Sequence, residues 1–145
     1  MSVLIEELSA PTEDDLAALN SLLPQLSSSA APLDAQALSR IIAQPGTSLL
    51  TARIDGALVG TLTLVVFPIP TGLRAWIEDV VVHESARRLG IGKALTEEAI
   101  KIAEELGART VDLTSRPSRQ PAVALYEQMG FKARQTNVYR LDQLG

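Results

Sequence analysis

A glycine-containing loop with three basic side chains lies in the middle of the chain. It reads Arg87-Arg88-Leu89-Gly90-Ile91-Gly92-Lys93. β-Branched and aromatic residues from Trp76 to Val82 predict a strand before it, and apolar residues at helical spacing predict a helix from Ile91 to Leu106. The first turn of a helix offers unpaired N–H groups and partial positive charge, and glycines let an anion come close. The loop therefore predicts a phosphate-binding site; the alternative is that the glycines only permit a tight turn.

Two common phosphate-binding motifs do not fit this loop. A Walker A loop needs a glycine where the chain has Arg87, and Ser or Thr where Ala94 follows Lys93. The dinucleotide-binding fingerprint needs a third glycine where the chain has Leu95. Another kind of phosphate-bearing ligand is therefore expected.

The remaining pattern resembles motif A of the GNAT superfamily of N-acetyltransferases. It is Arg-x-x-Gly-x-Gly, at Arg87, Gly90 and Gly92, after a strand that reads Glu-Asp-Val-Val-Val. Residues 122–131, Ala-Val-Ala-Leu-Tyr-Glu-Gln-Met-Gly-Phe, resemble a second motif of the same family, in the family's order and spacing. One position departs from it: Arg119 stands where the family often has an asparagine.

The resemblance implies an enzyme that moves an acetyl group from acetyl-CoA to a primary amine by direct attack, with no metal. The loop amides would hold the pyrophosphate, and the strand would pair with the pantetheine arm and stabilise the oxyanion through its N–H groups. The implied cofactor-binding residues are Val80, Val81, Val82, Arg87, Arg88, Leu89, Gly90, Ile91, Gly92 and Lys93.

Three side chains are candidates for proton transfer. Tyr126 would protonate the leaving thiolate, which suits a phenol that is protonated at neutral pH, although a packing role is the alternative. Glu78 and Asp79 are adjacent in an apolar strand, so they are expected on opposite faces. Burial would raise the pKa of a carboxyl group used as a base. The family resemblance favours Glu78 as the base, with Asp79 as the alternative.

Other polar and aromatic residues receive plainer interpretations. His83, the only histidine, is expected to face solvent. Arg116 and Arg119 would contact the 3′-phosphate of the cofactor or an anionic acceptor, or else lie in a solvated loop. Trp76 and Met129 are expected in the core.

Composition limits the class of protein. The chain of 145 residues predicts one domain, 1–145, and its net charge of −4 argues against nucleic acid or a membrane surface as the main partner. The absence of cysteine excludes disulfides and a cysteine nucleophile, and cytoplasm is the expected compartment. No apolar run is long enough to span a membrane.

The order of expected elements predicts a mixed α/β sandwich. Strands are expected at 3–5, 48–54, 57–66, 75–83 and 110–114, with a final strand pair after Phe131, of which 138–141 is the better defined. Helices are expected after Thr12, over 34–44, from Ile91 and over 122–129. The GNAT resemblance adds a central mixed, mostly antiparallel sheet with one parallel, splayed strand pair, flanked by helices.

Two questions stay open at this level. The same fold could serve as a non-catalytic acyl-CoA sensor or interaction module, although such a module would need neither Glu78 nor Tyr126. The acceptor is a small-molecule or peptide amine, and a homodimer is an open option. The Glu-Asp-Val-Val-Val strand resembles glucosamine-phosphate N-acetyltransferases, but residues 24–35 and 66–74 carry no recognisable acceptor signature.

Overall fold

The structure is a computed structural model that describes residues 2–142 and 144. The chain divides into two compact units, residues 1–114 and 115–145. The first unit contains β1 (Val3–Glu7), α1 (Glu13–Leu22), η1 (Leu23–Gln25), α2 (Ala35–Ala43), β2 (Thr47–Ile54), β3 (Ala57–Ile69), β4 (Gly72–Val82), η2 (Glu84–Ala86), α3 (Ile91–Glu105) and β5 (Thr110–Asp112). The second contains α4 (Gln120–Gln128).

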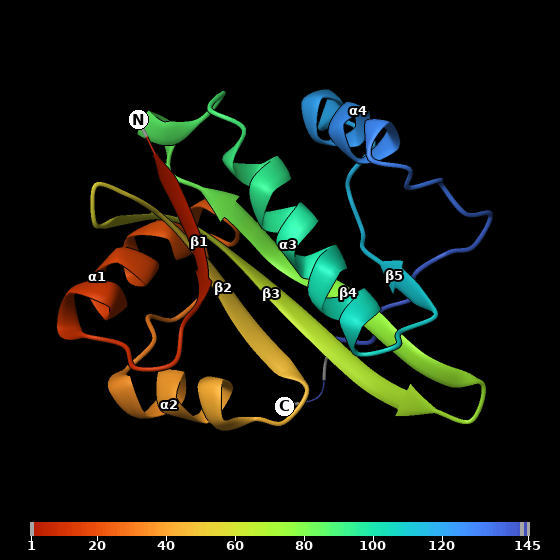
Figure 1. Cartoon of the computed structure of the whole chain (residues 1–145), viewed down its shortest axis with the longest axis horizontal. Coiled ribbons are helices and arrows are strands. Elements are labelled where there is room, and N and C mark those ends of the chain that lie inside the picture. The colour runs from red at the N-terminus through yellow and green to blue at the C-terminus, as the bar shows by residue number, and fades with distance from the viewer. Residues whose placement is uncertain (1, 143, 145) are drawn as a thin grey trace. The chain divides into compact units, whose positions relative to one another are not determined.

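The first unit is built on a five-stranded sheet in the order β1-β2-β3-β4-β5 (Figure 1). Neighbouring strands are antiparallel from β1 to β4, and β4 and β5 are parallel. The parallel pair is joined through α3, as the strand–helix–strand order predicts. The predicted fold class, a mostly antiparallel mixed sheet with helices, is confirmed.

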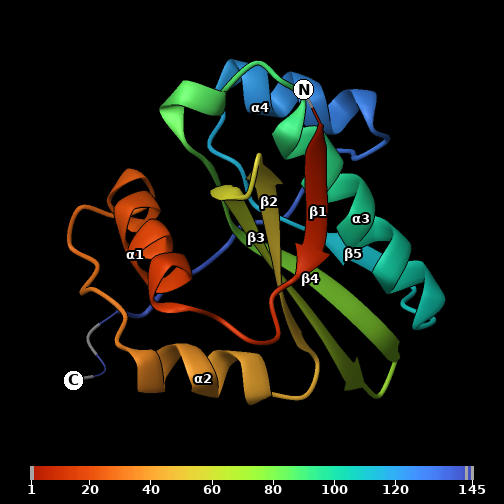
Figure 2. The ribbon, with the colours of Figure 1, turned by 60° about the vertical axis from the view of Figure 1, so that its left-hand side comes forward.

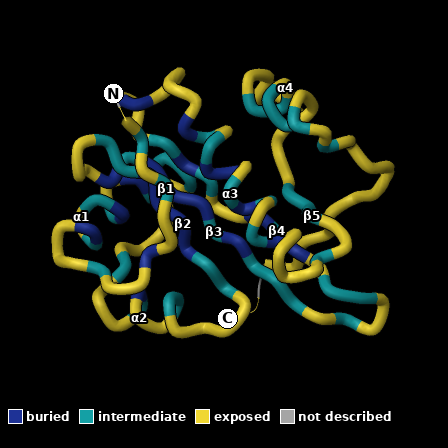
Figure 3. Tube along the Cα trace, viewed as in Figure 1, coloured by how far each residue is buried: buried dark blue, intermediate teal, exposed yellow. Residues whose placement is uncertain are grey.

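Helices cover both faces of this sheet (Figure 2). On one face, Ile91 and Leu95 of α3 pack over Gly60 of β3, where an added Cβ would lie 3.2 and 3.4 Å from their side chains. On the other face, leucines of α1 and α2 form an apolar cluster with side chains of β2, β3 and β4. Its buried members are Leu8, Leu19, Leu22, Leu38, Leu49, Leu58 and Val81. The strand centres and the inner side of α3 are accordingly the buried parts (Figure 3).

Local sequence signals set several helix ends. Thr12 caps α1, where its hydroxyl accepts from the amide of Asp15 and the Asp15 carboxylate accepts from the amide of Thr12. This reciprocal pair of contacts is a capping box, and the helix begins after Thr12 as predicted. At the end of α3, the amide of Gly107 donates to Glu104 and that of Ala108 donates to Ala103, with Gly107 at a φ of +86°. These two hydrogen bonds define a Schellman motif that ends the helix.

The β2–β3 hairpin also follows its sequence. Asp55 and Gly56 have φ values of +50° and +85°, as a type I′ turn requires at both central residues. The predicted end of β3 is wrong, because β3 continues past Pro68 to Ile69 and β4 begins at Gly72 instead of Ala75. Pairing of β3 with β2 ends at Val65, so Pro68 lies where β3 has only β4 beside it and a missing N–H costs little.

The second unit holds α4 and an irregular segment. The helix ends at Gln128, and beyond it the amide of Phe131 donates to Tyr126 and that of Gly130 donates to Glu127. The predicted strand pair after Phe131 is wrong, since residues 131–142 form no strand. Val138 and Tyr139, 71% and 89% exposed, have no described strand beside them and bury no face, and a β-branched sequence alone does not make a strand without such a partner.

Candidate active site

An extra residue in β4 changes the course of this strand near its centre. Thr61 of β3 pairs with Val81, whereas Thr63, two residues further on, pairs with Glu78. Three steps along β4 therefore match two along β3, which defines a β-bulge. Asp79 lies inside it with a φ of +51°, in the left-handed region that Asp adopts more readily than most residues.

The bulge shifts the side chains that follow it by one position. Val81 belongs to the apolar cluster on the face of α1 and α2, as Leu49 on β2 does. In a strand without a bulge, Val81 and Glu78 would lie on opposite faces of the sheet. Here they pair with Thr61 and Thr63, which share one face of β3, so Val81 and Glu78 also lie on the same face. The prediction that Glu78 and Asp79 point to opposite faces assumed regular extended backbone, and that regularity ends at Asp79.

The edge of β4 that faces β5 is open for half its length. β5 pairs only with Arg74 to Trp76. From Ile77 to Val82, no strand in the described part of the chain hydrogen-bonds to this edge. An extended ligand can add to such an edge like another strand, and this stretch includes the predicted pantetheine-binding residues 80–82.

The start of α3 lies at the same end of β4. Val82 pairs with Gly60, and Gly60 packs under Ile91, the first residue of α3. The open edge of β4 and the N-terminal amides of α3 thus follow one another in space as well as in sequence. An extended molecule that ends in phosphates matches this order, with its chain along β4 and its phosphates at the helix.

The loop before α3 has the backbone expected of an anion-binding turn. Gly90 caps α3 with a φ of +76°, and Arg88 is also left-handed, with a φ of +67°. An added Cβ at Gly92 would meet no protein atom within 4 Å, so the space in front of this residue is open. Every residue from Arg87 to Gly90 is exposed, and so is Lys93. The side chains of Arg87, Arg88, Leu89 and Lys93 are therefore accessible to a ligand, whereas that of Ile91 is buried.

One contact in this region carries no signal in the sequence. The guanidinium of Arg87 donates to Oε1 of Gln25 at 2.9 Å, which joins the loop to η1, 62 residues earlier. Gln25 is the last residue of η1 and lies in the segment considered for acceptor binding, residues 24–35, so Arg87 connects two candidate parts of the site. Only the three-dimensional fold brings these residues together.

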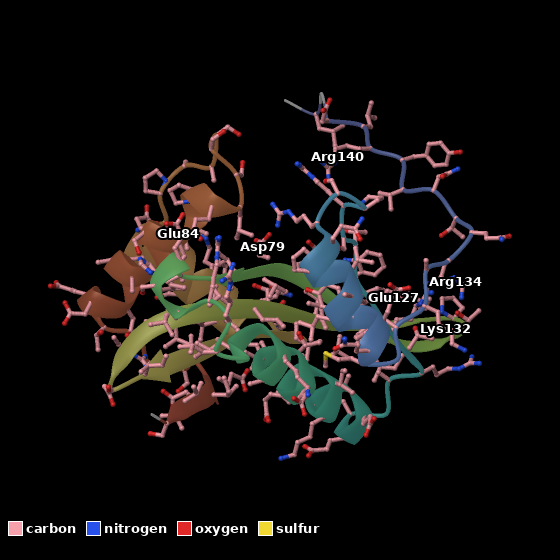
Figure 4. The ribbon with its side chains drawn as sticks, turned by 90° about the horizontal axis from the view of Figure 1, so that it is seen from above. Asp79, Glu84, Glu127, Lys132, Arg134 and Arg140 are labelled. Carbon is pink, nitrogen blue, oxygen red and sulfur yellow. The ribbon has the colours of Figure 1, made fainter. Side chains whose placement is uncertain are left out.

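Glu78 lies in the same unit as the loop, but its surroundings differ from those expected. Its side chain is exposed, as is that of Asp79, so the expected burial of the base is wrong for this structure. Glu78 pairs with Thr63 across the strands, and Thr63 pairs with Leu49 of the apolar cluster, so Glu78 lies on the face of the sheet that carries α1 and α2. Figure 4 labels Asp79 on β4 and Glu84 in the turn that follows.

The Glu78 carboxylate has one protein donor. The indole N–H of Trp76 donates to its Oε1 at 2.5 Å. Trp76 was expected in the core, yet it is half-buried, as Met129 is. His83 is exposed as expected, and its Nδ1 accepts from the amide of Ser85 at the start of η2.

Tyr126 lies on α4 in the second unit. Its ring packs edge-on against Phe131, with ring centroids 5.7 Å apart, so the expected packing role is present. Burial raises the pKa of Tyr126 above its usual value near 10, and the nearby Arg119 guanidinium lowers it by a smaller amount. The phenol is therefore protonated at neutral pH, as a general acid must be.

The structure gathers part of the predicted site. Glu78, Asp79, residues 80–82 and the loop 87–93 all belong to the first unit and adjoin the open edge of β4. Tyr126, Arg116 and Arg119 belong to the second unit, which is described by itself. Over residues 2–142 and Leu144, no group of three or more acidic or histidine side chains could hold a metal ion. No described helix is long and apolar enough to cross a membrane.

Comparison with known proteins assigns the chain to a family. Residues 14–131 match the model of the acetyltransferase (GNAT) family. Glucosamine 6-phosphate N-acetyltransferase of Trypanosoma brucei brucei is 34% identical over 144 residues, which covers 94% of this chain and 95% of that protein.

Two solved structures have the same fold. An acetyltransferase of Trypanosoma brucei superimposes with a TM-score of 0.80 at 31% identity, covering 97% of this chain and 99% of that one. A protein of Bacillus halodurans C-125 described as a transcriptional regulator superimposes with a TM-score of 0.83 at 31% identity. The match covers 97% of this chain and 100% of that one. The chain therefore belongs to the GNAT family of acetyltransferases and is an enzyme that transfers an acetyl group to an amine.

Proposed function

We propose that the chain binds acetyl-CoA along β4 and at the start of α3, and that its acceptor is an aminosugar phosphate such as glucosamine 6-phosphate. One observation carries the first half: the open edge of β4 from Ile77 to Val82 leads directly to the glycine-containing start of α3. Backbone groups of Val80 to Val82 would pair with the pantetheine arm. The amides from Leu89 to Lys93 would receive the pyrophosphate, with Arg87 and Arg88 adding positive charge.

The proposed chemistry assigns one task to each polar group. Glu78, or alternatively Asp79, accepts a proton from the acceptor ammonium through a water molecule. The neutral nitrogen then forms a bond to the thioester carbon while N–H groups of β4 stabilise the oxyanion. As the carbon–sulfur bond breaks, the nitrogen releases its second proton to solvent, while Tyr126 gives its phenolic proton to the thiolate and regains one from solvent. No covalent enzyme intermediate is required.

The acceptor proposal has two supports. The first is the relative with 34% identity, whose acceptor is named as glucosamine 6-phosphate. The second is charge, because residues 115–145 carry five basic and two acidic side chains although the whole chain has a net charge of −4. Lys132, Arg134 and Arg140 are labelled in Figure 4 together with Glu127. Arg116 and Arg119 are the proposed contacts for the acceptor phosphate or the 3′-phosphate of the cofactor.

The acceptor is tested by comparing matched amines. Release of the coenzyme A thiol is measured with glucosamine 6-phosphate, glucosamine, polyamines, amino acids and peptide N-termini. A phosphate held by charge-assisted hydrogen bonds predicts kcat/KM for glucosamine 6-phosphate about 10- to 100-fold above glucosamine. Equal values for the two sugars, or a higher value for an amine without phosphate, would overturn the acceptor proposal and leave the acetyl-CoA proposal intact.

Three further properties remain predictions from the sequence: a single domain over residues 1–145, a cytoplasmic compartment, and the option of a homodimer.

A further inference from the structure

Trp76 and Glu78 are two residues apart on β4 and meet through one hydrogen bond. The indole Nε1–H of Trp76 donates to Oε1 of Glu78. Side chains two positions apart on a strand share a face, and this contact lies just before the bulge at Asp79. The pair therefore belongs to the segment of β4 that remains regular.

Strand register shows which face the pair occupies. Trp76 pairs with Val65 and Glu78 with Thr63. Thr63 in turn pairs with Leu49, which packs in the cluster with α1 and α2. Cross-strand partners share a face, so Trp76 and Glu78 lie on the face opposite to α3. There the indole is half-buried and the carboxylate is exposed.

We propose that Trp76 is a positioning residue for acetyl transfer, whose indole N–H holds one oxygen of Glu78 and leaves the other free to accept the proton of the acceptor amine. This inference rests on the proposed role of Glu78 as the base. An exposed glutamate otherwise samples several rotamers, and a fixed donor restricts that freedom.

The charged groups around this pair are few and can be tested one by one. Asp79 is the next residue on β4 after Glu78. Asp112 of β5 pairs with Trp76 in the parallel register and accepts a hydrogen bond from Arg74 at 3.4 Å. Across β3, Thr63 and Val65 are uncharged. Asp79 and Asp112 are therefore the matched controls for any effect assigned to Glu78.

The contact itself is tested by fluorescence, because Trp76 is the only tryptophan. Its emission is recorded from pH 3 to 8, with far-UV circular dichroism confirming that the protein stays folded. We expect one step in emission that disappears in Glu78→Gln and persists in Asp79→Asn and Asp112→Asn. A step that survives Glu78→Gln, or the absence of any step in folded protein, would show that the Trp76–Glu78 hydrogen bond does not form in solution.

The positioning role is tested by replacing Trp76 with benzothienylalanine, which keeps the two fused rings and lacks the N–H. Loss of one hydrogen bond to a charged group predicts a decrease in kcat of about tenfold. The KM for acetyl-CoA should stay within about twofold, so that the effect is confined to kcat. Trp76→Phe serves as a second variant that also lacks the donor.

Glu78→Gln separates this inference from the proposed function. If Glu78→Gln loses activity while the benzothienylalanine variant retains the wild-type kcat, the positioning role is wrong and the base assignment stands. If Glu78→Gln keeps the wild-type kcat and its acidic limb, the base assignment fails and the positioning role fails with it. Failure of every amine to react in wild-type protein would contradict the proposed acceptors instead.

Discussion

Arg53 on β2 and Asp15 on α1 form an ion pair in which the guanidinium Nη1 lies 2.9 Å from the carboxylate. The Asp15 side chain is 7% exposed and that of Arg53 is 17% exposed. Arg53 also contacts Glu6 at 3.2 Å, while Asp15 completes the capping box with Thr12. The pair thus joins the first turn of α1 to β2 of the sheet.

Removing the cation should destabilise the fold strongly. Arg53→Ala leaves the Asp15 carboxylate buried without its cation, with the amide of Thr12 as its remaining donor. We therefore expect a loss of about 3 kcal/mol in the free energy of unfolding. Arg74→Ala is the matched control, because the Arg74–Asp112 pair is more exposed and should contribute at most about 1 kcal/mol. Urea unfolding measures both. Equal losses in the two variants would mean that burial does not govern the first pair.

The same pair should make stability depend on pH. The hydrogen bond from Arg53, opposed by burial and helped by Thr12, holds the pKa of Asp15 below its usual value. A lowered pKa in the folded state means that the stabilisation is complete above the pKa of the unfolded chain, about 3.9. It is lost as the pH falls through the lower folded value. Unfolding free energies between pH 2 and 7 should fall less steeply in Asp15→Asn; parallel curves would contradict this assignment.

The cofactor loop is tested by Gly92→Ala. An added Cβ meets no protein atom, and the φ of Gly92 is not among the positive values, so the free protein should keep its thermal midpoint or gain slightly. Affinity for acetyl-CoA should fall, because the methyl group enters the proposed phosphate space, and Gly92→Asp should reduce it further by adding negative charge. Calorimetry measures both affinities. Wild-type affinity for acetyl-CoA in Gly92→Asp would mean that the loop is only a turn and does not bind the cofactor phosphates.

Local signals explain which parts of the fold the sequence predicted correctly. Thr12 and Asp15 define a cap within one helical turn, and Asp55-Gly56 define a turn by backbone preference alone. The Arg-x-x-Gly-x-Gly loop was found for the same reason, since its glycines and cations are adjacent in sequence. The free edge of β4 beside it depends on where β5 stops pairing, and no local residue encodes that.

Non-local pairing accounts for the parts that the sequence did not predict. Glu-Asp-Val-Val-Val reads as an unbroken strand, and only its register against β3 reveals the bulge at Asp79. The contact of Arg87 with Gln25 and that of Trp76 with Glu78 depend on side-chain placement in the folded chain. The strand predicted at 138–141 failed because strand propensity needs a neighbouring strand to be realised.

Tyr126→Phe tests the proposed general acid. The variant keeps the ring that packs against Phe131, so the protein should remain as stable as the wild type. Its affinity for acetyl-CoA should stay within a few-fold of the wild-type value. Loss of the phenolic proton should lower kcat by roughly 10² to 10⁴. Steady-state kinetics at pH 7 suffice, because the raised pKa keeps Tyr126 protonated there. Wild-type turnover would assign the tyrosine to packing alone, with the thiolate leaving unassisted.

The most direct test of the account is a single turnover of acetyl-CoA, with enzyme in excess and glucosamine 6-phosphate as the acceptor. Mass spectrometry follows the N-acetylated product and a thiol reagent follows coenzyme A. The account predicts that the two appear together in equal amounts and that no acetylated enzyme accumulates. Binding of acetyl-CoA without transfer to this or any other amine would contradict it, and would favour a module that only binds the cofactor.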